Sequence, residues 1–150
     1  MNIADRAAAA NELFSCIRDR KTVSPLTEQH PKMTIEDAYQ ISRAILKQRQ
    51  QAGEVLVGKK IGVTSRAVQS MLDVRQPDFG YLTDAMQTGA DMPIGDRLIQ
   101  PRAEGELAFV LKHDLMGPGV TEEDVLAATD RVLACFEIVD SRVKDWRIKI

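Results

Sequence analysis

Two glutamates, Glu104 and Glu106, stand near the start of the segment RAEGELAFV, whose remaining residues are mostly those of a buried strand. In an extended chain alternate side chains point to the same face, so both carboxylates aim the same way, with their Cα atoms roughly 6.5 to 7 Å apart. Two like charges on a partly desolvated face repel each other unless a cation or basic side chains lie between them. The segment therefore predicts a strand whose carboxylates need a positively charged partner.

A third carboxylate, Glu137, lies inside the apolar segment LACFEIVDSR, where an unpaired charge would cost several kcal/mol or take up a proton. Three carboxylates from two strands describe a site for a hard cation, so Mg²⁺ or Mn²⁺ is expected. The alternative is ion pairing with Arg102, Arg142 or Arg147, because arginine and carboxylate pair well in a fork geometry. Spacing alone leaves both interpretations open.

Two lysines interrupt the apolar run EVLVGKKIGVTS. If this run is extended, only one of them can face the buried side of a sheet. Lys60 shares its face with Gly62 and Thr64, which leave room for a ligand, and a lysine beside a bound cation suits proton transfer. The alternative is that Lys59 and Lys60 both reach solvent along their aliphatic stems. Asp78, in the segment QPDFG, is by itself typical of the first residue of a turn.

The order of the predicted elements indicates an α+β chain. Apolar residues at steps of three and four predict a helix over the first twenty residues, and Thr34 with Asp37 predicts the start of a second helix that stops at Gly53. We therefore divide the chain into a helical region, 1–53, and the first part of a β-rich body, 54–150.

Two further segments complete this prediction. Thr121 and three acidic residues predict a helix that carries Val125, Ala128 and Val132 on one face. The last residues, DWRIKI, are typical of a strand. Cys16 and Cys135 both lie among apolar residues, so each is expected to be a buried, unreactive thiol.

Composition narrows the class of function. The chain is 44% hydrophobic and 28% charged with a formal net charge of -2, as expected of an ordinary globular domain. Its scattered Lys and Arg give no basic patch for nucleic acid or an anionic membrane, so a small-molecule or protein partner is expected. The first residues lack the apolar core of a signal peptide or spanning helix, which favours a cytoplasmic location.

Three segments, GKKIGVTSRAVQSMLDVRQPDFGYL, QPRAEGELAFVL and FEIVDSRVKDW, occur in this order. Together they resemble the 2-hydroxypenta-2,4-dienoate hydratases (2-keto-4-pentenoate hydratases) of aromatic meta-cleavage pathways, in the fumarylacetoacetase-like superfamily. The resemblance extends from about Ala38 onward. It implies N-terminal helices packed on a β-rich, mixed and barrel-like sheet. Members of this family are longer, so the chain is expected to be truncated at its C-terminus.

The resemblance also assigns roles to particular residues. It implies a divalent metal, Mg²⁺ or Mn²⁺, bound by Glu104, Glu106 and Glu137. Lys60 and Asp78 would be the catalytic groups that transfer protons and position the substrate. Ser65 and Arg66 would contact the substrate carboxylate.

The implied activity is hydration of 2-hydroxypenta-2,4-dienoate to 4-hydroxy-2-oxopentanoate, with the metal chelated by the 2-oxo acid and no redox cofactor. The resemblance also implies a homo-oligomer, and a neighbouring pathway enzyme is a further possible partner.

Three alternatives stay open. A related decarboxylase would act on 2-oxohex-3-enedioate (4-oxalocrotonate), although AVQ and QPDFG favour the hydratase. A C–C bond hydrolase would need a histidine base, and neither His30 nor His113 lies in a matching motif. The third alternative is a truncated, non-catalytic fragment or partner subunit.

Overall fold

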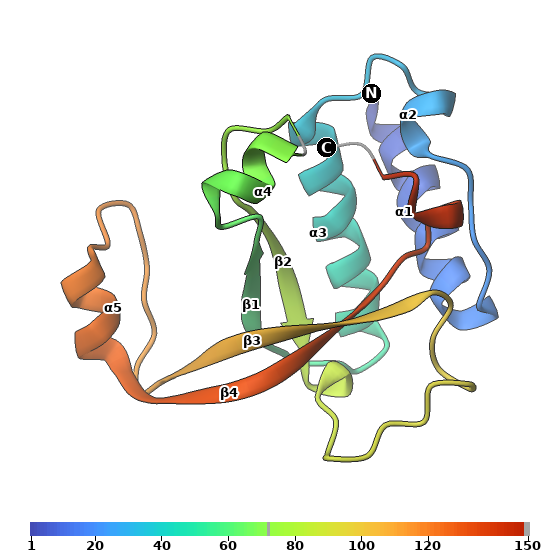
Figure 1. Ribbon diagram of the computed structural model, residues 1–150. Coiled ribbons are helices and arrows are strands. Elements are labelled where there is room, and N and C mark those ends of the chain that lie inside the picture. The colour runs from blue at the N-terminus through green and yellow to red at the C-terminus, as the bar shows by residue number, and fades with distance from the viewer. Residues whose placement is uncertain (72, 149–150) are drawn as a thin grey trace. The chain divides into compact units, whose positions relative to one another are not determined.

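The computed structural model of the chain describes residues 1–71 and 73–148, in which helices and strands are mixed along the sequence (Figure 1). The helices are α1 (Ile3–Asp19), α2 (Leu26–Gln29), α3 (Ile35–Gln51), α4 (Arg66–Met71) and α5 (Glu122–Ala128), with short 3-10 helices η1 (Asp84–Met86) and η2 (Lys144–Trp146). The strands are β1 (Leu56–Gly62), β2 (Asp78–Thr83), β3 (Pro101–Leu111) and β4 (Thr129–Asp140). None of the described helices is both long and apolar enough to cross a membrane.

These elements divide into two compact units, which we describe separately. The helical unit contains residues 1–100 and the segment that starts at Ser141, and the hairpin unit contains residues 101–140. Each unit has one two-stranded antiparallel sheet, β1 with β2 and β3 with β4. The predicted mixture of helix and sheet is confirmed, whereas the described residues form no closed barrel.

Helices α1 and α3 lie side by side and enclose the small core of the helical unit (Figure 1). Ala9 and Ala10 of α1 are buried against Ile41 of α3, and partly buried apolar side chains pack around them. Small alanine side chains let the two helices approach closely. Both predicted helices are confirmed, with nearly the predicted bounds. Cys16 is also buried in this unit, and burial, with the Glu12 carboxylate nearby, raises the pKa of its thiol.

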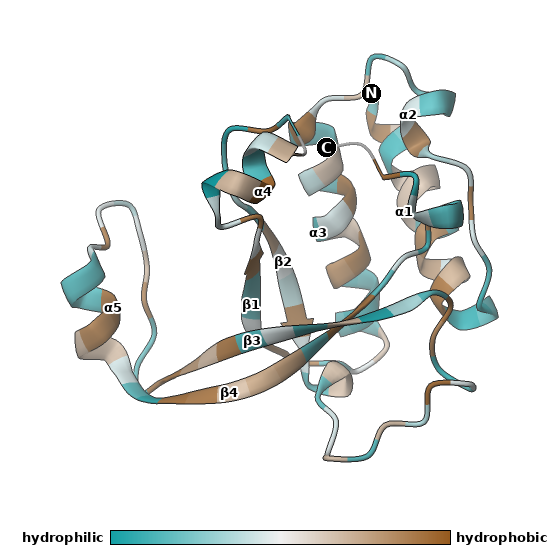
Figure 2. Cartoon of the chain, viewed as in Figure 1, coloured by the Kyte–Doolittle hydropathy of each residue, from teal (hydrophilic) through white to brown (hydrophobic). Residues whose placement is uncertain are grey.

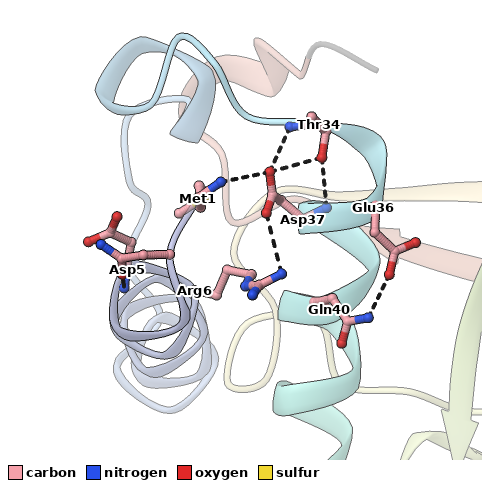
Figure 3. Close-up of polar contacts among 8 residues, drawn as sticks. Met1, Asp5, Arg6, Thr34, Glu36, Asp37 and Gln40 are labelled. Atoms are coloured by element: carbon pink, nitrogen blue, oxygen red, sulfur yellow. Dashed lines mark hydrogen bonds and ion pairs between the residues drawn. The ribbon is translucent and has the colours of Figure 1, made fainter.

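The start of α3 is fixed by a capping box, as the sequence predicts (Figure 3). The Asp37 backbone N–H donates to Thr34 Oγ1, at 3.2 Å, while Asp37 Oδ2 accepts from the Thr34 backbone N–H, at 3.0 Å. The same carboxylate pairs with the Met1 ammonium at 3.0 Å and the Arg6 guanidinium at 3.5 Å. Hydrogen bonds from Thr34 and from the Met1 ammonium lower the pKa of Asp37 to about 2.

The sheet of the helical unit joins Lys60 to Gly80 and Gly62 to Asp78 as directly opposed pairs. Its other face packs on α3, because Phe79 stacks on Tyr39 with ring centroids 4.5 Å apart. Lys59 is exposed and Lys60 is half-buried, as alternation along β1 predicts.

The hairpin unit is a long antiparallel pair with α5 between its strands in sequence. Thr121 caps the start of α5, as predicted, and forms a capping box with Asp124, but the helix ends at Ala128. Val132 therefore lies in β4, where it pairs with Phe109, so its predicted place on a helix is wrong. A β-branched residue suits a strand better than the last turn of a helix.

Much of β4 is hydrophobic in Figure 2, yet most of its residues are exposed. Phe136 is 78% exposed and Leu107, on the same face of the pair, is 64% exposed. The prediction that these strands are buried is therefore wrong for the described chain, because two strands alone supply no opposing layer. Cys135 is exposed for the same reason, contrary to the expectation of a buried thiol.

The last predicted strand is also not observed in the described residues. Lys144–Trp146 form η2, and Asp145 and Trp146 have φ of 55° and 57°, which breaks an extended run. Residues 149–150 of the segment DWRIKI lie outside the described residues. The neighbouring backbone instead makes a parallel bridge between Val23 and Val143.

Candidate functional site

The three glutamates come together on one face of the hairpin. Glu104 lies directly opposite Glu137 in the register of β3 and β4, and Glu106 follows two residues after Glu104 on the same face. Each residue offers a carboxylate oxygen, and the three oxygens lie within 4.8 Å of one another. The sequence predicts this convergence, and the antiparallel register provides it.

The chemistry of this cluster fits a hard divalent cation. Like charges directly opposite each other destabilise an antiparallel pair, so the arrangement favours a positively charged ligand. Three carboxylate oxygens, two of them on exposed side chains, are the ligand type of Mg²⁺, Mn²⁺ or Ca²⁺, and exposure leaves room for water or substrate oxygens in the remaining positions.

Gly105, between the two glutamates, faces the apolar side of the hairpin opposite Phe136. A side chain added at this position would meet nothing within 4 Å. Close packing among the described residues therefore does not explain this glycine.

One of the three arginines considered as alternative partners is engaged elsewhere. The Arg147 guanidinium pairs with the Glu28 carboxylate at 3.0 Å, and both side chains are about half exposed. This pair belongs to the helical unit. The arginine alternative is thereby reduced to Arg102 and Arg142.

Lys60 and Asp78 form the second group of candidate residues, within the helical unit. The stem of Lys60 runs along Gly80, since a Cβ built there would lie 3.2 Å from Lys60 Cγ. A Cβ built on Gly62 would lie 2.9 Å from Lys60 Nζ and 2.5 Å from Asp78 Oδ1. The two functional ends therefore point to the same place above Gly62.

Asp78 Oδ1 is buried and accepts no hydrogen bond from any of the described residues. A buried carboxylate oxygen without a donor is unfavourable, and a catalytic role is one explanation for such a group. The interpretation of Asp78 as the first residue of a turn is wrong, because Asp78 begins β2. Its place opposite Gly62 agrees with a role in proton transfer or positioning.

Ser65 and Arg66 follow β1 and start α4. Ser65 Oγ accepts from the Val68 backbone N–H at 3.2 Å, so its hydroxyl caps the helix and keeps its own hydrogen for a ligand. Arg66 is exposed at the first position of α4. The structure gives neither residue a neighbour that tests the predicted contact with a substrate carboxylate.

Gln69 supports the turn between β1 and α4, a role that sequence reasoning missed. Val63 has φ of 55°, which is strained for a β-branched residue, and Gln69 Nε2 donates to the Val63 carbonyl oxygen at 2.9 Å. In the sequence, Gln69 stands out only as part of the AVQ segment. No local pattern indicates which carbonyl oxygen its side chain contacts.

Comparisons with known proteins agree with the resemblance. Over 142 residues the chain is 62% identical to a 2-hydroxypent-2,4-dienoate hydratase of Pseudomonas putida. It is 60% identical over 141 residues to a 2-hydroxyhexa-2,4-dienoate hydratase of Comamonas testosteroni, and 40% identical over 150 residues to a 2-keto-4-pentenoate hydratase of Paraburkholderia xenovorans. Over these residues the chain is similar to members of the 2-keto-4-pentenoate hydratase family.

These alignments include 93%, 92% and 99% of the chain, but 64%, 53% and 56% of the respective relatives. The chain thus spans between about half and two thirds of the length of the curated family members it matches. No family model matches the chain.

Solved structures give the same result for the fold. The chain superposes with a TM-score of 0.89 and 30% identity on a 4-oxalocrotonate decarboxylase from Pseudomonas putida G7 complexed with magnesium and adipate. A second structure of this enzyme, complexed with calcium and acetate, gives a TM-score of 0.86 and 31% identity. The superpositions cover 99% and 97% of this chain and 57% and 56% of the decarboxylase chains.

Proposed function

We propose that the chain contributes to the divalent-metal-dependent hydration of 2-hydroxypenta-2,4-dienoate to 4-hydroxy-2-oxopentanoate in aromatic meta-cleavage catabolism. The observation that carries the proposal is the convergence of three carboxylates in a chain so similar to dienoate hydratases. Because the chain spans only part of those relatives, the substrate and the activity are proposals for this protein.

The metal ligands in this proposal are Glu104, Glu106 and Glu137. The magnesium and calcium in the solved decarboxylase structures support a divalent ion, and the oxygen donors here favour Mg²⁺ or Mn²⁺. When bound, the ion would supply Lewis-acid stabilisation of the charge that develops on the substrate 2-oxygen. The arginine interpretation of the carboxylates is the alternative, through Arg102 or Arg142.

Lys60 and Asp78 are the proposed catalytic groups. One of them would take the proton of the 2-hydroxyl group and a proton would be delivered to C5, which converts the dienol into a 2-oxo-3-enoate. Water would then add with its oxygen at C4 and a proton at C3, so that the product contains the substrate and one water molecule. The buried Oδ1 of Asp78, which lacks a hydrogen-bond donor among the described residues, supports its use as a proton acceptor.

Ser65 and Arg66 are the proposed contacts for the substrate carboxylate. The Arg66 guanidinium is exposed at the start of α4, and the Ser65 hydroxyl retains a hydrogen to donate. Gln69 would keep both residues in place because it supports the strained turn that precedes them.

The experiment that tests the proposal follows the ultraviolet absorbance of 2-hydroxypenta-2,4-dienoate in the presence of this chain and Mn²⁺ or Mg²⁺. We expect the absorbance to decay with metal, to stop with chelator and to recover when metal is restored in excess. Formation of 4-hydroxy-2-oxopentanoate identifies hydration. Absence of decay with either metal would contradict the activity of this chain.

The decarboxylase reaction is the second candidate, favoured by the structural match to 4-oxalocrotonate decarboxylase. The higher identity to dienoate hydratases favours hydration instead. Incubation with 2-oxohex-3-enedioate distinguishes the two, because release of carbon dioxide from this substrate, with no consumption of the dienoate, would replace the hydratase assignment.

Further predictions of the sequence accompany this proposal. They are a cytoplasmic location, a homo-oligomer, association with a neighbouring pathway enzyme, a barrel-like sheet in the complete fold, and the division into residues 1–53 and 54–150.

A further inference from the structure

Two glycines border Lys60 on the face of the β1–β2 sheet that carries Asp78. Gly80 lies directly opposite Lys60 on β2, and Gly62 lies two residues after Lys60 on the same face of β1. The Lys60 stem occupies the space beside Gly80, and the Lys60 ammonium shares the space above Gly62 with Asp78 Oδ1. The absence of side chains at Gly62 and Gly80 therefore leaves the space that the two functional groups occupy.

The atoms that a side chain at Gly62 would meet are unusual. A Cβ there would approach Asp78 Oδ1 to 2.5 Å and Lys60 Nζ to 2.9 Å, and both are the far ends of movable side chains. The next nearest atom is Asp78 Cγ, at 3.6 Å. An added methyl group would thus displace the ammonium and the carboxylate without pressing on the backbone.

Gly58 provides the contrast within the same strand and on the same face. A Cβ at Gly58 would meet only Leu82 Cδ1, at the ordinary van der Waals distance of 3.9 Å. Gly62 has negative or extended φ, as Gly58 does, since neither is among the glycines with positive φ. Backbone freedom therefore does not explain Gly62, and the space above it does.

We propose that Gly62 and Gly80 are positioning residues that hold the Lys60 ammonium and the Asp78 carboxylate at one point for proton transfer. Gly80 sets the path of the lysine stem, and Gly62 sets the position of the two charged ends. The inference rests on the proposed function for its chemical meaning, although the geometry of the pair can be tested separately.

The geometric test uses NMR of protein labelled with ¹³C-lysine, in which the Lys60 side-chain signals are identified by their loss in Lys60→Arg. We expect Gly62→Ala to shift the Lys60 Cε signal, and the matched variant Gly58→Ala to leave it unchanged. Unchanged Lys60 signals in Gly62→Ala would overturn the proposal. Gly80→Ala, which presses on Lys60 Cγ at 3.2 Å, provides a second route to the same shift if Gly62→Ala fails to fold.

The kinetic test compares the same variants in the dienoate assay. We expect Gly62→Ala to lower kcat roughly 100-fold with KM changed less than about twofold, because misplacing reacting groups by about 1 Å has an effect of this size. Gly58→Ala should keep wild-type kcat. A shifted Lys60 signal with normal kcat would overturn the positioning role, whereas an inactive wild-type chain would contradict the proposed function and leave the NMR result to decide the geometry.

Discussion

The two strand pairs of this chain present their functional groups in different surroundings. In the β1–β2 pair, Lys60 and Asp78 are half-buried, and the opposite face of the sheet packs on α3 through Phe79 and Tyr39. In the β3–β4 pair, Glu104 and Glu106 are exposed. The comparison indicates that the packed pair fixes its groups through neighbouring atoms, whereas the register of the hairpin brings its carboxylates together.

The largest expected effect concerns the packed pair. Lys60→Met and Asp78→Asn should each lower kcat by roughly 10² to 10⁴-fold, because a positioned proton-transfer group contributes about that much to rate. Steady-state kinetics of the dienoate reaction measures this, with Lys59→Met as the matched control, since Lys59 lies on the other face of β1. Equal losses in Lys59→Met and Lys60→Met would show that a general loss of positive charge is responsible.

The metal affinity of the hairpin provides the next contrast. Glu106→Gln and Glu137→Gln should weaken Mn²⁺ binding by on the order of 100-fold or more, since loss of even a supporting group of a metal site costs up to that amount. Isothermal titration calorimetry measures the affinity directly. Glu123→Gln, an exposed acidic residue of α5, is the control. Wild-type Mn²⁺ affinity in Glu106→Gln and Glu137→Gln would remove the carboxylate cluster from the proposed site.

The stability of the helical unit should depend on acid through Asp37. The pKa of Asp37 is lowered to about 2 in the folded chain from its ordinary value of 3.8. Its contribution to the free energy of unfolding is therefore complete above about pH 4 and is lost as the pH falls toward 2. Denaturant titrations between pH 5 and pH 2 should show a smaller decline for Asp37→Asn than for the wild type, and equal declines would contradict this assignment.

The smallest expected effect is on the stability of the β3–β4 pair, and its sign differs with and without metal. In chelator, Glu104→Gln should stabilise the β3–β4 pair by roughly 0.2 to 1 kcal/mol, because it removes a like charge opposite Glu137. With saturating Mn²⁺ the same change should destabilise the pair by removing a ligand. Hydrogen exchange of the strand amides measures both effects. Stabilisation under both conditions would mean that no cation joins the two residues.

Local signals explain why much of the fold was predictable. Thr34 with Asp37 and Thr121 with Asp124 cap helices within four residues, so the beginnings of α3 and α5 follow from the sequence. The alternation that brings Glu104 and Glu106 to one face is equally local. The opposition of Glu104 and Glu137 depends on the register of two distant strands, which spacing alone does not determine.

The errors have a common physical origin. Apolar composition indicated buried strands and a buried Cys135, but burial depends on what covers a strand, and the described hairpin has no second layer. The strain at Val63 and the hydrogen bond from Gln69 depend on a turn geometry that the sequence alone does not predict. The approach of both Lys60 Nζ and Asp78 Oδ1 to the space above Gly62 likewise depends on the pairing of β1 with β2.

Gln100 lies just before β3 and fastens the backbone that follows β4. The Gln100 side-chain amide donates to the backbone carbonyl oxygens of Ser141 and Val143, each at 3.0 Å. The Gln100 backbone carbonyl oxygen accepts from Trp146 Nε1 at 3.1 Å. The two ends of the hairpin therefore leave the helical unit side by side, as the ends of an inserted module do. Evolution or protein engineering could therefore lengthen, shorten or exchange the hairpin between Gln100 and Ser141, where the helical unit holds both ends.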